Sequence, residues 1–158
     1  METGTVYLKR ERLSELERDL IELKTNQRKV IAEKIAEARG HGDLSENAEY
    51  DAAKEAQSHL EMKIGKLENL LSRAKVVKPE EIPDDEVYVL CSVQVLDLKH
   101  HEEITFTLVS PDESDFELDK ISITSPLGKA LLGKKVGDIV TVEVPGSKIE
   151  YKILKISK

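Results

Sequence analysis

The chain has 158 residues, of which 35% are charged and 4% aromatic, with one Cys, no Trp and a net charge of −7. So few aromatic residues exclude one large aromatic core, and a single Cys excludes an internal disulfide framework. No apolar run approaches the roughly 18 residues of a membrane span, and no signal-peptide core is visible. We therefore expect a soluble cytoplasmic protein that does not act in a membrane.

Charge is distributed unevenly along the chain. Residues 76–158 carry 10 Lys and Arg against 16 Asp and Glu, so this part is a poor candidate for binding nucleic-acid phosphates. Residues 24–39 carry five basic residues against two acids. A basic stripe is therefore predicted only on the first of the helices described next.

Two long amphipathic helices are predicted between Leu8 and Ala74. Apolar residues follow a 3-4-3 spacing from Leu13 to Leu23, which is typical of a coiled-coil seam. The spacing then becomes 4-4-4 as far as Ile35, which should locally unwind a supercoil. A second seam, from Tyr50 to Ala74, keeps the 3-4 spacing and has its small and polar members nearest the turn. The short connection predicts an antiparallel helical pair whose packing is leanest at the turn.

The turn carries the stretch "GDLSENAEY" (residues 42–50), in which Asp43 and Glu46 stand three residues apart. One interpretation is helix capping, with Asp43 as N-cap and Glu46 completing a capping box. The other is metal binding, although two carboxylates hold Mg²⁺ weakly unless a partner adds further oxygen ligands. Both interpretations are compatible with these residues.

After a Pro-rich and acidic linker (residues 78–86) the pattern changes to strands and one short helix. Strands are predicted over Val87–Leu98, Glu103–Ser110 and Asp119–Ser125, and as a hairpin over Ile139–Ile156. A helix is predicted from Ser125 as N-cap, through Pro126 at its first position, to a stop at Gly133. We expect Cys91 to be a buried strand residue. About five strands with one helix across a face make a small α+β domain.

Two segments resemble a known family. "IAEARGHGDLSENAEYDAAKEAQ" (residues 35–57) and "SPLGKALLGKKVGDIVTVEVPG" (residues 125–146) resemble the bacterial Gre transcript cleavage factors, and more specifically their GreA branch. The resemblance runs essentially from end to end. It implies an antiparallel α-helical coiled-coil hairpin over residues 1–77, a linker over 78–86 and an FKBP-like α+β domain over 87–158.

The resemblance also implies a mechanism in which the protein assists another enzyme. Such a factor binds RNA polymerase as a monomer and inserts its hairpin through the secondary channel. Asp43 and Glu46 then help polymerase hold a second Mg²⁺ beside the extruded RNA 3′ end and position water. Polymerase itself cleaves the backtracked transcript, so the protein is an accessory factor that binds no cofactor on its own.

Further contact residues follow from the same match. Arg39 and Lys54 would face the RNA, although both are equally compatible with solvated helix charge. Asn47 and Tyr50 would contact polymerase or RNA, while Tyr50 also occupies a seam position and could simply pack there. Three residues would dock the C-terminal domain at the channel rim, unless they serve only as helix cap and core: Ser125, Pro126 and Leu127.

Three alternative functions compete with this one. A peptidyl-prolyl isomerase would use the FKBP-like domain, but it needs an aromatic-lined pocket, and residues 87–158 contain only four aromatic residues. A Gre-like regulator would enter the channel and inhibit or compete without promoting cleavage, which the two intact acids argue against. A plain coiled-coil adaptor would leave the turn motif without a purpose.

Overall fold

The structure, a computed structural model, describes residues 4–42 and 47–158. The described residues form two compact units: Glu11–Arg73 contains the first, and residues 4–10 join Ala74–Lys158 in the second. The prediction of an N-terminal helical region and a C-terminal sheet domain is confirmed. No helix among the described residues is long and apolar enough to cross a membrane.

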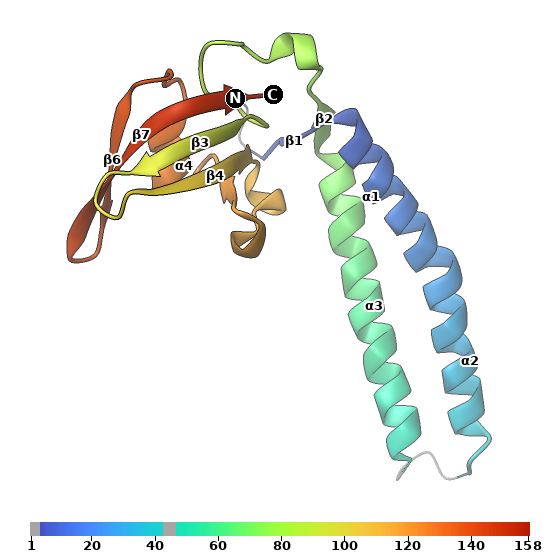
Figure 1. The fold of residues 1–158 in the computed structure, drawn as a ribbon. Helices are drawn as coiled ribbons and strands as arrows, with labels where there is room; N and C mark the ends of the chain where they lie inside the picture. Colours follow the sequence, from blue (N-terminus) through green and yellow to red (C-terminus); the bar gives the residue numbers. More distant parts are fainter. Residues whose placement is uncertain (1–3, 43–46) are drawn as a thin grey trace. The chain divides into compact units, whose positions relative to one another are not determined.

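The helical unit consists of two arms that lie side by side (Figure 1). Its elements are α1 (Arg10–Glu22), the π-helix η1 (Leu23–Gln27), α2 (Arg28–Arg39) and α3 (Ala48–Ser72). The first arm runs without a break from α1 through η1 to α2, and η1 lies where the predicted seam changes its spacing. A π-helical turn holds more residues than an α-helical one, so it absorbs the extra residue that the altered spacing introduces.

The seam between the arms is apolar. Leu16, Ile35 and Ala38 of the first arm are buried, and so are Ala53, Leu60 and Ile64 on α3, which packs against α2 and η1. The buried residues on α3 follow the spacing predicted for the second seam. Gln27, which the predicted seam of the first arm included, is exposed and lies in η1. Supercoiling of the pair stays a prediction.

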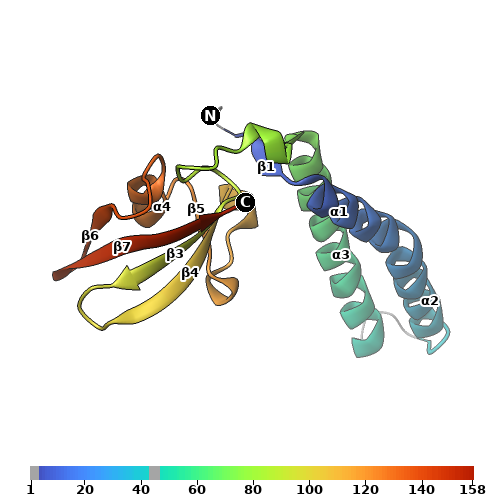
Figure 2. The same ribbon diagram turned by 45° about the horizontal axis from the view of Figure 1, so that its top comes forward.

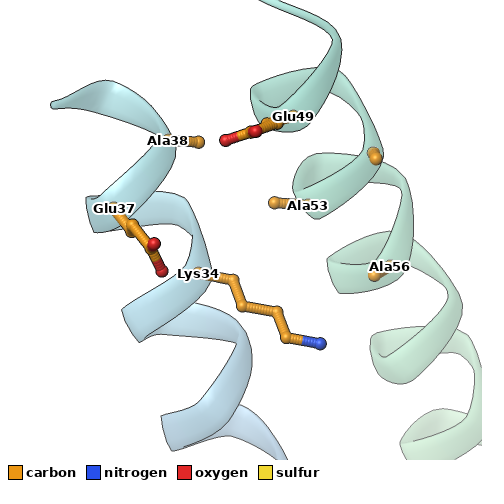
Figure 3. Close-up of a pocket in the computed structure, with 7 residues that line it drawn as sticks. Lys34, Glu37, Ala38, Glu49, Ala53 and Ala56 are labelled. Carbon is orange, nitrogen blue, oxygen red and sulfur yellow. The ribbon is translucent and has the colours of Figure 1, made fainter. Parts of the chain in front are cut away.

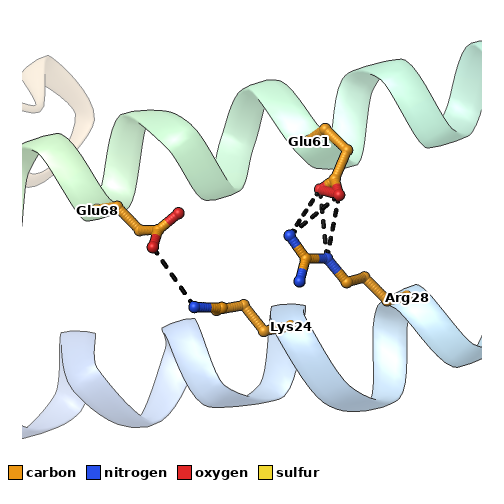
Figure 4. Close-up of polar contacts among 4 residues, drawn as sticks. All are labelled: Lys24, Arg28, Glu61 and Glu68. Atoms are coloured by element: carbon orange, nitrogen blue, oxygen red, sulfur yellow. Dashed lines mark hydrogen bonds and ion pairs between the residues drawn. The ribbon is translucent and has the colours of Figure 1, made fainter.

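Among the described residues, Lys24 and Arg28 of the first arm each form an ion pair with a Glu of α3 (Figure 4). Lys24 Nζ lies 3.4 Å from Glu68 Oε2, and the Arg28 guanidinium donates to both carboxylate oxygens of Glu61, its Nε at 3.1 Å from Oε1. The later residue of the first arm pairs with the earlier residue of α3, so the arms are antiparallel. These side chains are about half exposed, so each pair contributes on the order of 0–1 kcal/mol. Two of the five cations of the predicted basic stripe are therefore already paired.

The second unit contains a five-stranded sheet in the order β5-β4-β3-β7-β6. Its strands are β3 (Ser92–Asp97), β4 (Glu102–Val109), β5 (Lys120–Ser122), β6 (Ile139–Val144) and β7 (Ser147–Ser157). Neighbours are antiparallel except β4 and β5, which are parallel. Burial alternates along β3, as expected for a strand with one face on the core. The predicted number of strands in this sheet is confirmed.

One helix covers the core face of the sheet. This helix, α4 (Pro126–Leu131), is seen beside the strands in Figure 2. Its Leu131 is fully buried in the same core cluster as Val93, Val95 and Ile153. The helix approaches β5 closely, because a Cβ added at Gly128 would lie 2.0 Å from the Ser122 carbonyl oxygen. The predicted start is confirmed: Ser125 is the N-cap, its Oγ accepting from Gly128 N–H at 3.0 Å, and Pro126 is the first helical residue.

Two segments differ from the predicted secondary structure. The predicted strand Val87–Leu98 begins only at Ser92, because Leu90 has a φ of +72° and turns the backbone before β3. Cys91 is buried as expected but precedes the strand, and burial raises the pKa of its thiol above the ordinary value of 9.0. The helix predicted to begin near Leu8 begins at Arg10, because Val6–Leu8 forms β1, parallel to β2 (Ala74–Val76).

The segment predicted as a linker is part of the second unit. Residues 78–86 contain the 3-10 helix η3 (Pro79–Glu81) and the buried Ile82, which packs with Tyr7, Val77 and Val89. Residues before Arg10 belong to the same unit, since Tyr7 lies in this cluster. The units therefore divide at Arg10 and Ala74 rather than at the predicted positions 77 and 87.

Candidate functional site

The candidate site is the end of the helical pair, between α2 and α3. α2 ends at Arg39, where the backbone N–H of Gly40 donates to the carbonyls of Ala36 at 3.3 Å and Glu37 at 3.0 Å. Gly42 then has a φ of +107°, in the region that a residue without a Cβ tolerates best. The described backbone therefore leaves α2 through a glycine turn immediately before the acidic motif.

Asn47 joins the two sides of this turn. Its Oδ1 accepts from the backbone N–H of Tyr50 at 3.1 Å, which makes Asn47 the N-cap of α3. Its Nδ2 donates to the carbonyl of Ala38 at 2.6 Å, on the opposite arm. A cap directly precedes the first helical residue, which here is Ala48, whereas Asp43, the residue predicted as a cap, lies outside the described residues. Asn47 was predicted as a contact residue, and its N-cap role was missed, although Asn is among the preferred cap residues.

The two acids that carry the predicted chemistry, Asp43 and Glu46, lie outside the described residues. Their assignment as metal ligands and assistants of catalysis stays a prediction. In the described parts of the chain, no group of three or more His, Cys, Asp or Glu side chains is arranged to hold a metal ion.

The other predicted contact residues of the turn lie around this junction. The Arg39 guanidinium lies over the Tyr50 ring, 5.9 Å from its centroid, so these two residues are brought together across the arms. Lys54 is exposed on α3, where its Nζ donates to Gln57 Oε1 at 2.9 Å. Contact of these side chains with RNA or polymerase stays a prediction.

A groove of about 310 Å³ lies between the arms just behind the turn (Figure 3). Ala38 and the α3 alanines 52, 53 and 56 line it, together with Lys34, Glu37 and Glu49. Small side chains leave this space unfilled, which confirms the lean packing predicted near the turn. Besides the buried Ala38 and Ala53, three polar contacts join the described residues here: the Asn47–Ala38 hydrogen bond, the Arg39–Tyr50 contact, and His41 Nδ1 at 3.5 Å from Glu49 Oε2.

The three docking residues predicted on the second unit have structural roles of their own. Ser125 caps α4, Leu127 packs against the core and Pro126 is exposed. Two of the four aromatic residues available to an isomerase pocket, Phe106 and Tyr151, pack edge to face inside the core with ring centroids 6.0 Å apart. Their rings stabilise the sheet domain.

Family models match almost the whole chain. The model described as "Transcription elongation factor, N-terminal" matches residues 6–76, and "Transcription elongation factor, GreA/GreB, C-term" matches residues 82–158. The chain belongs to the GreA/GreB family of transcription elongation factors.

Individual relatives place the chain among GreA-type members of this family. Transcription elongation factor GreA of Chlorobaculum parvum is 53% identical, with 96% of both chains covered. The GreA of Thermoanaerobacter pseudethanolicus is 51% identical, with 97% of this chain and 98% of the relative covered. These names do not favour the alternative of a channel-entering competitor. Among solved structures, GreA factor homolog 1 of Thermus thermophilus is 27% identical over 98% of this chain and 99% of that chain, with a TM-score of 0.46.

As a GreA/GreB family member, the chain is a transcription elongation factor of the GreA type. The N-terminal family model covers the turn between α2 and α3, and the C-terminal model covers the complete sheet. In the described part of the turn, Asn47 caps α3 and donates a hydrogen bond to the opposite arm. Charged side chains of both signs, such as Arg39 and Glu49, lie around it.

Proposed function

We propose that this elongation factor binds RNA polymerase, inserts its helical pair into the secondary channel and stimulates cleavage of the backtracked transcript 3′ end. In this role it is an accessory factor, and the polymerase active centre performs the hydrolysis. The helical pair is then a coiled-coil hairpin that delivers its turn, and the FKBP-like sheet domain docks at the channel rim. The acting form is a monomer.

The position of the acidic motif is the observation that carries this proposal. Asp43 and Glu46 lie in the sequence between the end of α2 at Arg39 and the cap of α3 at Asn47. The first arm runs from Arg10 to Arg39, which at 1.5 Å per residue is a rod of about 45 Å. An antiparallel pair of this length supports a function in which the turn reaches deep into a partner.

The two carboxylates suit the metal that the proposal involves. Mg²⁺ prefers oxygen ligands in octahedral geometry, and in phosphoryl chemistry it is bound by only one or two carboxylates plus other ligands. Asp43 and Glu46 would hold it together with polymerase. When bound, the ion would stabilise negative charge on phosphate oxygens and activate water.

The neighbouring residues would prepare this site. The Asn47 bond to Ala38 fixes one arm to the other directly beside the motif, which limits how far the turn can spread. Arg39 and Lys54 are exposed and would face the phosphates of the extruded RNA, with Arg39 restrained by the Tyr50 ring. These contacts support RNA positioning by the described residues.

Transcript cleavage by stalled, backtracked RNA polymerase tests this proposal. We expect the wild-type protein to accelerate cleavage and Asp43→Asn or Glu46→Gln to abolish the acceleration, because each removes a charged ligand while leaving the hairpin and its binding intact. Asp51→Asn is the matched control, since Asp51 is an exposed acid just beyond the motif. We expect this control to keep full stimulation.

Two results would reject the proposal. A double Asp43→Asn, Glu46→Gln variant that stimulates as well as wild type would show that the acids play no part. A wild-type protein that binds polymerase but slows cleavage would establish the competing function instead.

A further inference from the structure

The two edges of the five-stranded sheet differ in how well they are protected. β5 forms one edge with three residues, whereas β6 forms the other with six (Figure 1). Among the described strands β6 pairs with β7 alone, so alternate N–H and C=O groups along its outer side have no strand partner. Very short strands, Pro and Lys commonly protect a sheet edge, and the β6 sequence IVTVEV has none of these features. An extended segment of another chain can therefore add to the sheet at β6.

Two exposed aliphatic side chains lie at the start of this edge. Val136, just before β6, is 58% exposed, and Ile139, its first residue, is 57% exposed. Val140 is buried in the core, so Ile139 lies on the solvent face of the strand. Aliphatic side chains suit packing against a protein segment, whereas single-stranded nucleic acid stacks its bases on aromatic rings. The apolar part of this surface therefore favours a protein partner.

Hydrogen bonds fix the turn before β6, residues 134–138, which we name the basic turn. The N–H of Gly137 donates to the Ile153 carbonyl at 2.8 Å, and the N–H of Ile153 donates to the Asp138 carbonyl at 2.9 Å. The Oδ2 of Asp138 accepts from the backbone N–H of Lys135 at 2.9 Å. A turn held in this way needs little further ordering when a partner binds.

The start of the β6 edge is basic, although the C-terminal region around it is acidic. Lys134 and Lys135 of the basic turn are exposed, and so is Lys152, which lies opposite Ile139 on β7. Residues opposite each other in a ladder share a face, so Ile139 and Lys152 are neighbours there. Within the described parts of the chain, none of these three ammonium groups is in an ion pair.

The far end of the β6–β7 hairpin does not share this positive charge. Glu143 of β6 forms an ion pair with Lys148 of β7 at 3.7 Å, and Glu150 lies opposite Thr141. Free positive charge is therefore concentrated beside the basic turn. A partner strand that matches this edge carries its carboxylates at the end that lies beside the basic turn.

We propose that the β6 edge binds an extended acidic segment of a second protein, which adds to the sheet as a further strand. The backbone of this segment bonds to β6, its apolar side chains pack on Val136 and Ile139, and its carboxylates pair with the lysines beside them. The docking residues predicted for polymerase begin elsewhere, because the Ser125 Oγ donates to the Ser122 carbonyl of β5 at 2.6 Å, at the opposite edge. The proposal thus goes beyond the proposed function and gives this elongation factor a second protein partner.

A synthetic peptide of alternating Glu and Val residues tests the proposal on the full-length protein. Fluorescence anisotropy of the labelled peptide measures the Kd, and a peptide of alternating Lys and Val of the same length is the matched probe. We expect the Glu–Val peptide to bind about tenfold more tightly or better, because its charge complements the basic turn. Amide hydrogen exchange should slow in β6 on binding and stay unchanged in β5, because only β6 gains backbone bonds.

Charge variants test the role of the basic turn. Lys134→Glu combined with Lys135→Glu should raise the Kd of the Glu–Val peptide about tenfold or more, because like charges then meet. The turn itself should persist, since its hydrogen bonds use the backbone of Lys135. Lys75→Glu combined with Lys78→Glu is the control, an equal charge change on exposed lysines in and beside β2. This control should change the Kd less than about threefold.

An apolar variant tests the contact at the start of β6. Ile139→Ser should raise the Kd of the Glu–Val peptide about threefold or more, because a Val of the peptide loses its apolar neighbour. Leu118→Ser is the control, since Leu118 is 63% exposed in the same unit but lies between β4 and β5. It should leave the Kd within about twofold of wild type.

Several outcomes would overturn the proposal. It fails if the Glu–Val peptide does not bind wild type, or binds no more tightly than the Lys–Val peptide. Binding without slower exchange in β6 would also reject strand addition. Self-association of the free protein with slowed exchange in β6 would assign this edge to a second copy.

Transcript cleavage separates the proposal from the proposed function. We expect the Lys134→Glu, Lys135→Glu variant to stimulate cleavage as well as wild type, because its partner is not polymerase. Loss of stimulation together with peptide binding would assign the edge to polymerase docking and overturn the second partner. A wild type that binds the peptide but does not stimulate cleavage would overturn the proposed function alone.

Discussion

At the scale of single residues, the side-chain amide of Asn47 makes two structural hydrogen bonds, one as acceptor and one as donor. Its amide oxygen accepts from Tyr50 N–H and its amide nitrogen donates to the Ala38 carbonyl. Asn and Gln alone carry both an acceptor and an N–H₂ donor on a neutral side chain, and Asn has the length preferred at an N-cap. The turn thus joins the arms through one residue of the acidic motif that is itself uncharged.

Substitution of Asn47 should loosen the end of the helical pair in two steps. Asn47→Ser keeps a capping oxygen and loses the donor to Ala38, whereas Asn47→Ala loses both. We expect Asn47→Ala to lower the free energy of unfolding by about 1–2 kcal/mol and Asn47→Ser by less. Urea unfolding followed by helical circular dichroism measures both, with the exposed Ser58→Ala as control. Equal stability of Asn47→Ala and wild type would show that the cap and the bond to Ala38 are dispensable.

At the scale of elements, long periodic segments were predictable and short or strained ones were not. The seams of the arms and the strands on either side of Pro145 follow directly from apolar spacing. β1 and β2 have three residues each and pair across more than sixty residues of chain, so local pattern carries no signal for them. Val87–Leu90 has strand-like residues, yet its backbone turns at Leu90. Asp43 and Asn47 are both residue types preferred at an N-cap, and their composition alone does not show that Asn47 caps α3.

The π-helix η1 aligns the buried residues on its two sides along one face of the first arm. Leu16 and Ile35 are both buried although they stand nineteen residues apart in one continuous arm. Five turns of regular α-helix take 18 residues, so an α-helix throughout would rotate Ile35 by about 100° away from the seam. The wide turn at Leu23–Gln27 absorbs the extra residue and keeps both side chains on one face of the arm.

Deletion of one residue in η1 should therefore be tolerated. Removal of Asn26, which is exposed, would convert η1 to regular α-helix with Leu16 and Ile35 still on one face. We expect the free energy of unfolding to stay within about 0.5 kcal/mol of wild type, or to rise. Deletion of Met62, an exposed residue in the uninterrupted helix α3, is the control and should cost several kcal/mol, because it moves Leu60 and Ile64 out of register. Equal losses for the two deletions would reject this role of η1.

At the scale of the whole molecule, two segments far apart in the sequence, residues 4–10 and Ala74–Lys158, belong to the same unit. The segment before Arg10 supplies β1 beside β2, and Tyr7 packs with Ile82 and Val89. The helical pair is therefore an insertion within the sheet unit rather than a separate domain that precedes it in the chain. The predicted domain bounds did not place β1 in the sheet unit, since no composition change marks a strand in this part of the chain.

One buried hydrogen bond tests this closure of the sheet unit. The Oγ of Ser110, a residue with no solvent exposure, accepts from the backbone N–H of Tyr7 at 2.8 Å across 103 positions of chain. Ser110→Ala removes this acceptor in the interior and should lower the free energy of unfolding of the sheet unit by about 1–3 kcal/mol. Ser114→Ala is the control, because Ser114 is exposed and its Oγ donates locally to Pro111, so its loss should stay within about 0.5 kcal/mol. Hydrogen exchange at Tyr7 should quicken in Ser110→Ala while exchange in α3 stays unchanged. If exchange at Tyr7 is unaffected, contacts other than the Tyr7–Ser110 hydrogen bond hold β1 in the sheet unit.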